Sequence, residues 1–187
     1  MENIFVEGLK ENNINKLLSA PKSDLHNHST KGCRRAWLAE RLQVEIPEPP
    51  QHLDGLEGMQ NWFRSNIKPV CDGYKNMLLR WEGAFAEARR NNITRLVMNF
   101  GTAEVNQVGT VEEFRELIEG FHKSYCTDSI FEAELTYPSF GNVEEEVDEL
   151  DKYAEAGYFK AIDICAGENV KPFEAFYHYT GKLRSTI

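Results

Sequence analysis

The sequence has no long hydrophobic run and no excess of positive charge. No apolar stretch among its 187 residues approaches the roughly 20 residues that a membrane-spanning helix needs. Lysine and arginine total 21 against 30 aspartates and glutamates, and the resulting net charge of −9 repels phosphate backbones and anionic lipid headgroups. We therefore expect neither nucleic acid nor a membrane surface to be a general partner.

A secretory signal and a cysteine-based motif are also missing. The first residues, Met1 to Ile4, lack the basic and apolar regions of a secretory signal, so we expect a cytoplasmic protein. The 4 cysteines lie far apart with no Cys-x-x-Cys pair, which argues against a zinc ribbon or a redox motif. Because cytosolic disulfides are rare, we expect these cysteines to be reduced and mostly buried.

What the sequence does contain is a regular alternation of apolar segments and helix signals. An amphipathic helix is expected from Phe5 to Leu18, and a helix with one buried face from Tyr74 to Ala88. Capping boxes predict further helix starts at Thr110 and Asn142, Gly157 is placed to end the second of these helices, and Pro172 opens another. Strands are expected at 23–28, 93–100, 130–137, 159–166 and 183–187.

This alternation predicts the fold class. Strands about thirty residues apart with a helix in each gap are βαβ units, which build parallel sheets. We expect an α/β fold: a partial TIM-type (β/α) barrel of the first four to five βα units, with a helical insertion after the first strand. A full barrel needs about 250 residues, so residues 1–187 are expected to form a single domain, the N-terminal half of a truncated barrel. Length alone also fits a complete smaller α/β sheet.

His26 and His28 are the strongest chemical signal. Residues two apart on a strand point to the same face, so both imidazoles can meet one cation. Neutral imidazole is a good ligand for zinc and similar divalent metals, and barrel enzymes carry their sites at the carboxyl ends of the strands. The two histidines are therefore predicted to bind Zn²⁺ or another divalent metal.

The surrounding residues resemble a known family. Residues Pro21 to His28 are similar to the Pro-Lys-x-Asp/Glu-Leu-His-x-His run that opens the adenosine deaminase family of metal-dependent amidohydrolases. Residues 61–70 and 94–100 are similar in order and spacing to the lid region and second strand of that family. Ala161 to Glu168 resembles its fourth-strand Asp-Leu-Ala-Gly-Asp-Glu motif.

The resemblance implies hydrolytic deamination of a purine nucleoside, or a related aminated ring, by a metal-activated water. In the family, two histidines of the first strand bind zinc together with a histidine from strand five and an aspartate from strand eight. A glutamate beside the strand-five histidine acts as the acid. No catalytic residue is identified here, since these residues are expected beyond Ile187, and the chain alone is expected to be inactive. The expected partner is a small-molecule substrate, and the oligomeric state stays open.

Four residues are predicted to contact substrate. Thr30 stands where many adenosine deaminases have an aspartate that contacts ribose, which puts adenosine itself in doubt. Gly167 corresponds to the glycine that contacts the purine, although an alignment without a gap places Ala166 there. Trp62 and Phe63 offer flat apolar walls suited to a purine base, or else belong to a helix core.

Two alternatives stay open. A metal-dependent phosphoesterase of the polymerase-and-histidinol-phosphatase type also opens with Asp-Leu-His-x-His-Ser/Thr, which Asp24 to Thr30 fits. The further Asp-Gly and Thr-Asp-His segments of that family are not found in a convincing place. The second alternative is a truncated or degenerate copy without activity, which at most binds a metal.

Overall fold

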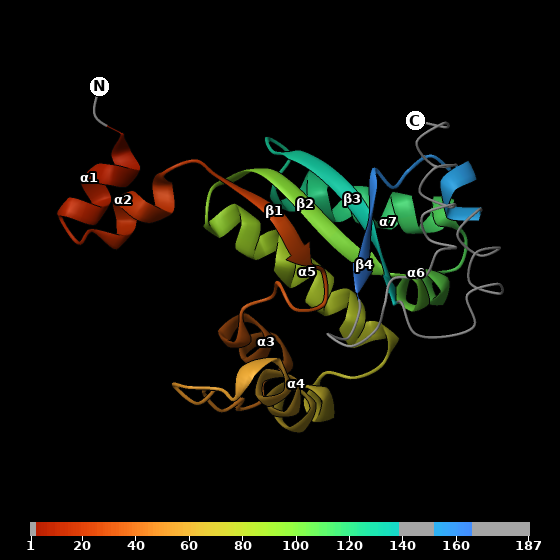
Figure 1. Cartoon of the computed structure of the whole chain (residues 1–187), viewed down its shortest axis with the longest axis horizontal. Coiled ribbons are helices and arrows are strands. Elements are labelled where there is room, and N and C mark those ends of the chain that lie inside the picture. Colours follow the sequence, from red (N-terminus) through yellow and green to blue (C-terminus); the bar gives the residue numbers. More distant parts are fainter. Residues whose placement is uncertain (1–2, 139–151, 166–187) are drawn as a thin grey trace.

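The expected parallel sheet is present in the computed structural model, which describes residues 3–138 and 152–165, the side chains of Tyr137, Pro138 and Ile164 excepted. Four strands lie in the order β1-β2-β3-β4, and every neighbouring pair is parallel (Figure 1). Their bounds are Lys22–His28, Ile93–Gly101, Ile130–Pro138 and Ala161–Cys165. The α/β class and the partial barrel are thereby confirmed.

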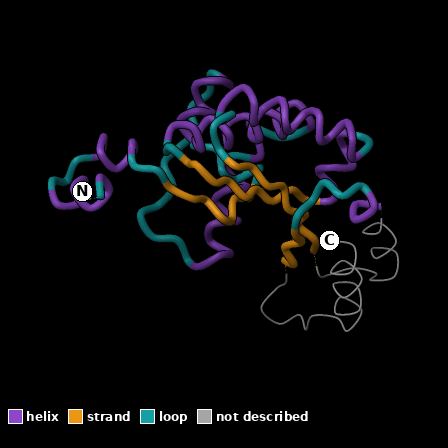
Figure 2. The backbone as a smooth tube through the Cα atoms, turned by 90° about the horizontal axis from the view of Figure 1, so that it is seen from above, coloured by secondary structure: helices purple, strands orange, loops and turns teal. Residues whose placement is uncertain are grey.

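Helices cover one face of this sheet. Figure 2 shows the helical layer on one side of the strands, and α5 (Tyr74–Arg90) and α7 (Val111–Tyr125) form most of it. The buried side of α5 includes Trp81 and Phe85, both fully buried, which confirms the predicted helical stripe. Trp81 packs edge-to-face on Phe100 of β2 and Phe114 of α7, at centroid distances of 5.3 and 5.6 Å. Aromatic burial therefore joins sheet and helices.

The start of α7 is fixed by the predicted capping box. The Thr110 side chain accepts a hydrogen bond from the backbone N–H of Glu113, and the Glu113 carboxylate accepts one from the backbone N–H of Thr110 at 2.8 Å. A short helix that the sequence analysis did not predict, α6 (Thr102–Val108), lies between β2 and α7. After the helical residues 152–155, which follow β3 in the chain, Gly157 has a φ of +64°, as expected of a helix stop.

The predicted helical insertion follows β1. It consists of α3 (Arg35–Leu42), α4 (Gly55–Asn66) and a 3₁₀ turn, η1 (Lys68–Val70), and it lies beyond the carboxyl end of β1 (Figure 1). The insertion has its own small core, separate from the main one. The buried members of this core are Leu38, Ile46, Ile67 and Cys71.

The prediction of a single N-terminal helix from Phe5 to Leu18 is wrong. Two short helices, α1 (Ile4–Lys10) and α2 (Ile14–Ser19), stand beside the amino end of β1. Asn12 has a left-handed φ of +51°, which a continuing helix cannot contain, and the Asn13 side chain caps α2. Asparagine tolerates both roles, so the Asn-Asn pair divides the helix.

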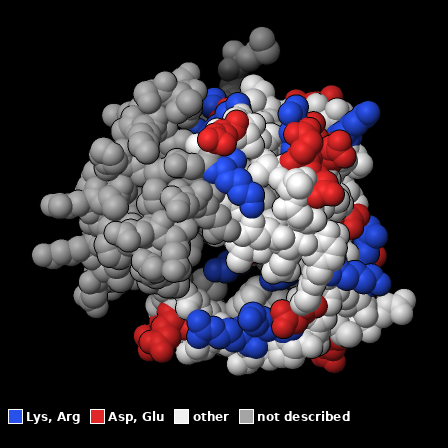
Figure 3. Space-filling model, turned by 90° about the vertical axis from the view of Figure 1, so that its right-hand side faces the viewer, with Lys and Arg blue, Asp and Glu red and all other residues white. Residues whose placement is uncertain are grey.

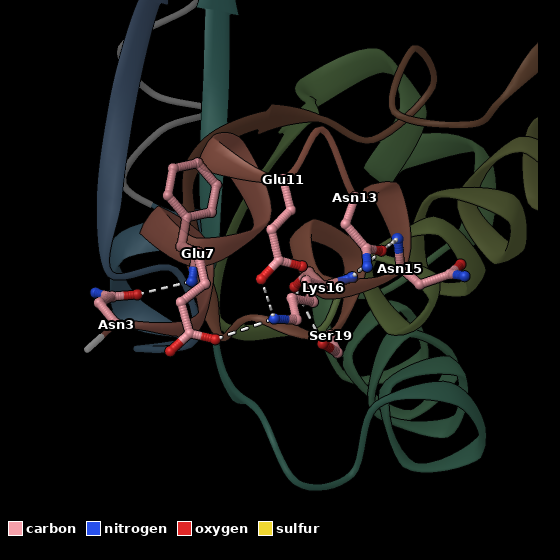
Figure 4. Close-up of polar contacts among 8 residues, drawn as sticks. Asn3, Glu7, Glu11, Asn13, Asn15, Lys16 and Ser19 are labelled. Atoms are coloured by element: carbon pink, nitrogen blue, oxygen red, sulfur yellow. Dashed lines mark hydrogen bonds and ion pairs between the residues drawn. The ribbon is translucent and has the colours of Figure 1, made fainter. Parts of the chain in front are cut away.

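Two lysines stabilise this helical pair. Lys16 forms ion pairs with Glu7 at 3.2 Å and Glu11 at 2.8 Å, as Figure 4 shows. Lys22, the first residue of β1, donates from Nζ to three backbone carbonyls at the end of α2, the nearest at 2.6 Å. The lysine of the Pro-Lys run therefore caps a helix, where a positive charge also suits the helix dipole.

Surface charges of both signs are interspersed on the side of the molecule seen in Figure 3. Exposed pairs such as Arg115 with Glu119, at 2.9 Å, are screened by solvent and add little to the stability of the fold. The main core, rather than these pairs, holds the sheet to its helices. Within the described ranges, no helix is both long enough and apolar enough to cross a membrane.

The remaining expectations concern cysteines and the C-terminal region. All 4 cysteines are free, Cys71 and Cys126 are buried, and Cys33 and Cys165 are half-buried. The capping box at Asn142, the helix from Pro172 and the strand 183–187 lie outside the described residues.

Candidate metal centre

The face of the sheet opposite the helices carries polar side chains near the carboxyl ends of the strands. In the parallel registers His28 pairs with Asn99, and Thr136 pairs with Asp163. Side chains alternate along a strand, so the intervening positions, such as Met98, point into the helical layer and are buried in the main core. Because alternate residues of each strand point to opposite faces, the residues between the apolar core positions form the polar face.

His26 and His28 lie together on this polar face. Their ring centroids are 4.9 Å apart and the rings are perpendicular. The register advances from Asp24 to Asn27 while β2 advances only from Leu96 to Met98, so the strand is irregular beside His26. The shared orientation expected from the sequence is retained despite this bulge, and the two rings are placed to meet one ion.

Asp163 of β4 joins the two histidines. Its Oδ2 lies 3.9 Å from Nε2 of His26, and one ligand atom from each of the three residues lies within 4.8 Å of the others. Because two strands separate β4 from β1 in the sheet, this approach requires the sheet to curve as a barrel wall does. Asp163 lies within the segment Ala161 to Glu168 that resembles the fourth-strand motif of the family, but the sequence alone did not place it at the metal.

Asn99 of β2 lies between these groups and is almost completely buried, at 2% exposure. Its Nδ2 donates to Oδ2 of Asp163 at 2.9 Å and lies 3.5 Å from Nδ1 of His26. Its Oδ1 and the nearby Oγ1 of Thr136 are buried and have no partner in the part of the chain that the structure describes. Buried polar atoms are normally satisfied, so these two indicate a place for a ligand or water.

The donor set fits a catalytic divalent metal. Two imidazoles and a carboxylate are typical ligands of catalytic zinc, which also needs an open position for water. Burial, reinforced by the charges of His26 and Lys31, lowers the pKa of His28 and favours the neutral ring that binds metal. Burial also raises the pKa of Glu134, which lies on β3 two residues before Thr136, although the His26 charge opposes that shift.

The chain after His28 is held in place by two contacts that motif reading did not reveal. The backbone N–H of Ser29 donates to the Asn99 carbonyl at 3.0 Å, and the Ser29 hydroxyl donates to Glu104 of α6 at 3.3 Å. Glu104 also accepts the backbone N–H of Gly101 at 3.1 Å. These bonds join the ends of β1 and β2, so the His28 backbone is well fixed.

An apolar cavity of about 260 Å³ adjoins the insertion. Three of the predicted substrate-contacting residues, Thr30, Trp62 and Phe63, line the same cavity, together with Cys33 and Leu38. Their role in binding stays a prediction. The fourth, Gly167, and its alternative Ala166 lie outside the described residues.

Comparison with known proteins gives similarity of structure only. No family model matches the chain, and no curated protein matches it in sequence. The N6-methyl-AMP deaminase of Arabidopsis thaliana is similar with a TM-score of 0.66 and 15% identity, over 90% of this chain and 56% of its own. An adenine deaminase from Arthrobacter aurescens has a TM-score of 0.59 and 13% identity, over 86% of this chain and 54% of its own.

A third similar structure contains a metal. An amidohydrolase from Burkholderia ambifaria with bound Zn has a TM-score of 0.61 and 18% identity, over 88% of this chain and 49% of its own. The chain therefore spans about half the length of these three proteins and has the fold of deaminase-like amidohydrolases.

Proposed function

We propose that this chain supplies the metal-binding end of a deaminase barrel that hydrolyses an amine from a purine nucleoside, a purine nucleotide or a related aminated ring. The observation that carries the proposal is the meeting of His26, His28 and Asp163 at the carboxyl ends of β1 and β4. Barrel enzymes place their chemistry at this end.

The structural neighbours support this choice of reaction. They are named as an N6-methyl-AMP deaminase and an adenine deaminase, and Arabidopsis ADAL, also similar in fold, is complexed with GMP and with IMP. All of these ligands and names concern purines. The phosphoesterase alternative has no comparable support.

The residues of this chain suit the proposed chemistry. Bound zinc would lower the pKa of a water molecule towards neutrality and so provide a hydroxide nucleophile. The lowered pKa of His28, caused mainly by burial, favours the neutral ring that binds such an ion. Trp62 and Phe63 line an apolar cavity that suits a flat base, and Thr30, which carries a hydroxyl, lines the same cavity.

We further propose that residues 1–187 alone have negligible deaminase activity. The family resemblance implies further metal ligands and an acidic glutamate on later strands, and the chain spans about half of its structural neighbours. In the extreme case the chain is a degenerate copy that has no catalytic activity and at most binds a metal. In both cases the proposed ligands His26 and His28 are part of this chain, so metal binding can be tested directly.

The test measures metal binding first and turnover second. The metal-free chain is titrated with Zn²⁺, and His26→Ala and His28→Ala are each expected to weaken binding by about 100-fold or more. Ammonia release is then followed from adenosine, AMP and adenine, and methylamine release from N6-methyl-AMP. Zinc binding that neither histidine variant changes refutes the proposal. Turnover that depends on His26 supports deamination and overturns the inactivity of the isolated chain.

A further inference from the structure

The position of Asp163 goes beyond what the family resemblance implies for this part of the chain. That resemblance assigns only His26 and His28 to the metal and takes the other ligands from later strands. In the structure, the Asp163 carboxylate faces the same two rings from β4, with all three ligand atoms within 4.8 Å of one another. The described residues therefore contain three donors and not two.

We propose that Asp163 is a direct protein ligand of the metal and that Asn99 is the residue that positions it. This inference rests on the proposed function, because it concerns the same ion. The described part of the chain then supplies three ligands to the ion, His26, His28 and Asp163.

The separation of the donors is compatible with ligation of one shared ion. Oδ2 of Asp163 and Nε2 of His26 are 3.9 Å apart, which is too long for a hydrogen bond. Two donors on a tetrahedral zinc with bonds near 2.1 Å are separated by roughly 3.4 Å. The two atoms thus need to approach each other by only about 0.5 Å to share an ion, a shift that side-chain rotation can supply.

Asn99 provides the orientation. Its Nδ2 donates to Asp163 Oδ2 at 2.9 Å, and its burial at 2% exposure leaves the amide little freedom to turn. Ligating carboxylates are usually hydrogen-bonded in this way by a neighbour that is not itself a ligand. The same Nδ2 lies 3.5 Å from Nδ1 of His26, so Asn99 contacts two of the three donors.

The charge of the site supports the assignment. Two neutral imidazoles alone leave both positive charges of a divalent ion uncompensated, whereas one carboxylate balances half of that charge. Asp163 is only 20% exposed in its side chain and has no lysine or arginine partner among the ion pairs of the described residues. A half-buried carboxylate without a fixed cation is a good metal ligand.

The experiment uses the full 187-residue chain and the metal alone. The metal-free protein is titrated with Co²⁺, whose visible absorption reports the number and type of ligands, and Zn²⁺ affinity is measured by competition with a chromophoric chelator. The variants are Asp163→Asn, which keeps the shape but removes the charge, and Asn99→Ala. The matched control is Glu132→Gln, an acid on the same polar face of β3 at the other end of the strand.

If Asp163 is a ligand, Asp163→Asn weakens metal affinity by more than about 100-fold and changes the Co²⁺ spectrum. Asn99→Ala weakens affinity by about 10- to 100-fold and leaves the spectrum unchanged in shape, as expected of a positioning residue. Glu132→Gln changes neither. Should Asp163→Asn not fold, Asp163→Glu, which moves the carboxylate by one methylene, is expected to shift the Co²⁺ spectrum instead.

Affinity and spectrum that are unchanged in Asp163→Asn, or a weakening with an unchanged spectrum, would overturn direct ligation. Such a result would leave the proposed function intact as long as His26→Ala and His28→Ala still abolish binding. Metal binding that is insensitive to both histidines refutes the proposed function and this inference together.

Discussion

Replacing Gly83 with alanine tests how the insertion is held against α5. A methyl group at Gly83 would lie 2.2 Å from Sγ of Cys33 and 2.9 Å from Cε3 of Trp37. Ordinary contacts between carbon atoms are about 3.5–4.0 Å, so the segment leading into α3 and α3 itself must move outward. The same segment lines the apolar cavity through Cys33, so the change affects the candidate site as well as stability.

Two opposing effects determine the magnitude. Alanine stabilises a helix interior by about 0.5–1 kcal/mol relative to glycine. Overpacking a close contact costs about 1–3 kcal/mol, and here both clashing groups belong to short or rigid side chains. We therefore expect Gly83→Ala to lower the free energy of unfolding by about 1–2 kcal/mol, measured by urea denaturation with circular dichroism.

Gly120 of α7 offers a matched control, since a methyl group there meets nothing within 4 Å. Gly120→Ala is expected to raise the free energy of unfolding by about 0.5–1 kcal/mol. Adding Cys33→Ala to Gly83→Ala removes the nearest clashing atom and should restore part of the loss. Equal stability of Gly83→Ala and Gly120→Ala would refute this account of the packing.

Three further predictions concern separate parts of the chain. Lys22→Met leaves three carbonyls at the end of α2 without their donor, so urea unfolding should show a loss of about 1–3 kcal/mol, with faster amide exchange in α2. Thr110→Ala should cost about 1 kcal/mol in the same assay. The Thr110 backbone N–H also holds the pKa of Glu113 below its usual value. The stabilisation that the Glu113 carboxylate provides is therefore present at neutral pH and is lost as the pH falls through that lowered pKa. Free Zn²⁺ at about 100 times its Kd should stabilise the chain by about 2.7 kcal/mol in thermal unfolding, and His26→Ala should abolish this gain.

Hydrophobic period and capping chemistry were sufficient to predict most of the fold. The strand at 93–100 and the helix starting at Thr110 are recognisable because their signals are local: β-branched runs in one case and a side chain that bonds three residues away in the other. The prediction of one continuous N-terminal helix failed for a local reason too. Periodicity does not register a single left-handed residue such as Asn12, and that residue divides the helix.

The metal centre was only half predictable. His26 and His28 are two residues apart, so strand geometry alone places them together. Asp163 lies far along the chain, and its approach depends on the curvature of a four-stranded sheet, which no local pattern encodes. Asn99 gave no signal at all in the sequence, because a single asparagine at the end of an apolar strand is as readily a turn residue.

The burial pattern explains why these residues meet where they do. Among the residues that the structure describes, the buried side chains are apolar except for two, Ser29 and Asn99. Ser29 directly follows β1 and Asn99 lies two residues before the end of β2, so both are near the carboxyl ends of the strands, as the histidines are. Leaving Oδ1 of Asn99 buried without a partner costs about 1–3 kcal/mol, which an apolar residue there would avoid. The same buried amide of Asn99 donates a hydrogen bond to the Asp163 carboxylate and lies beside His26, so it can orient that carboxylate. For the proposed metal site, the stability lost at Asn99 is the cost of holding the proposed ligands ready before the ion arrives.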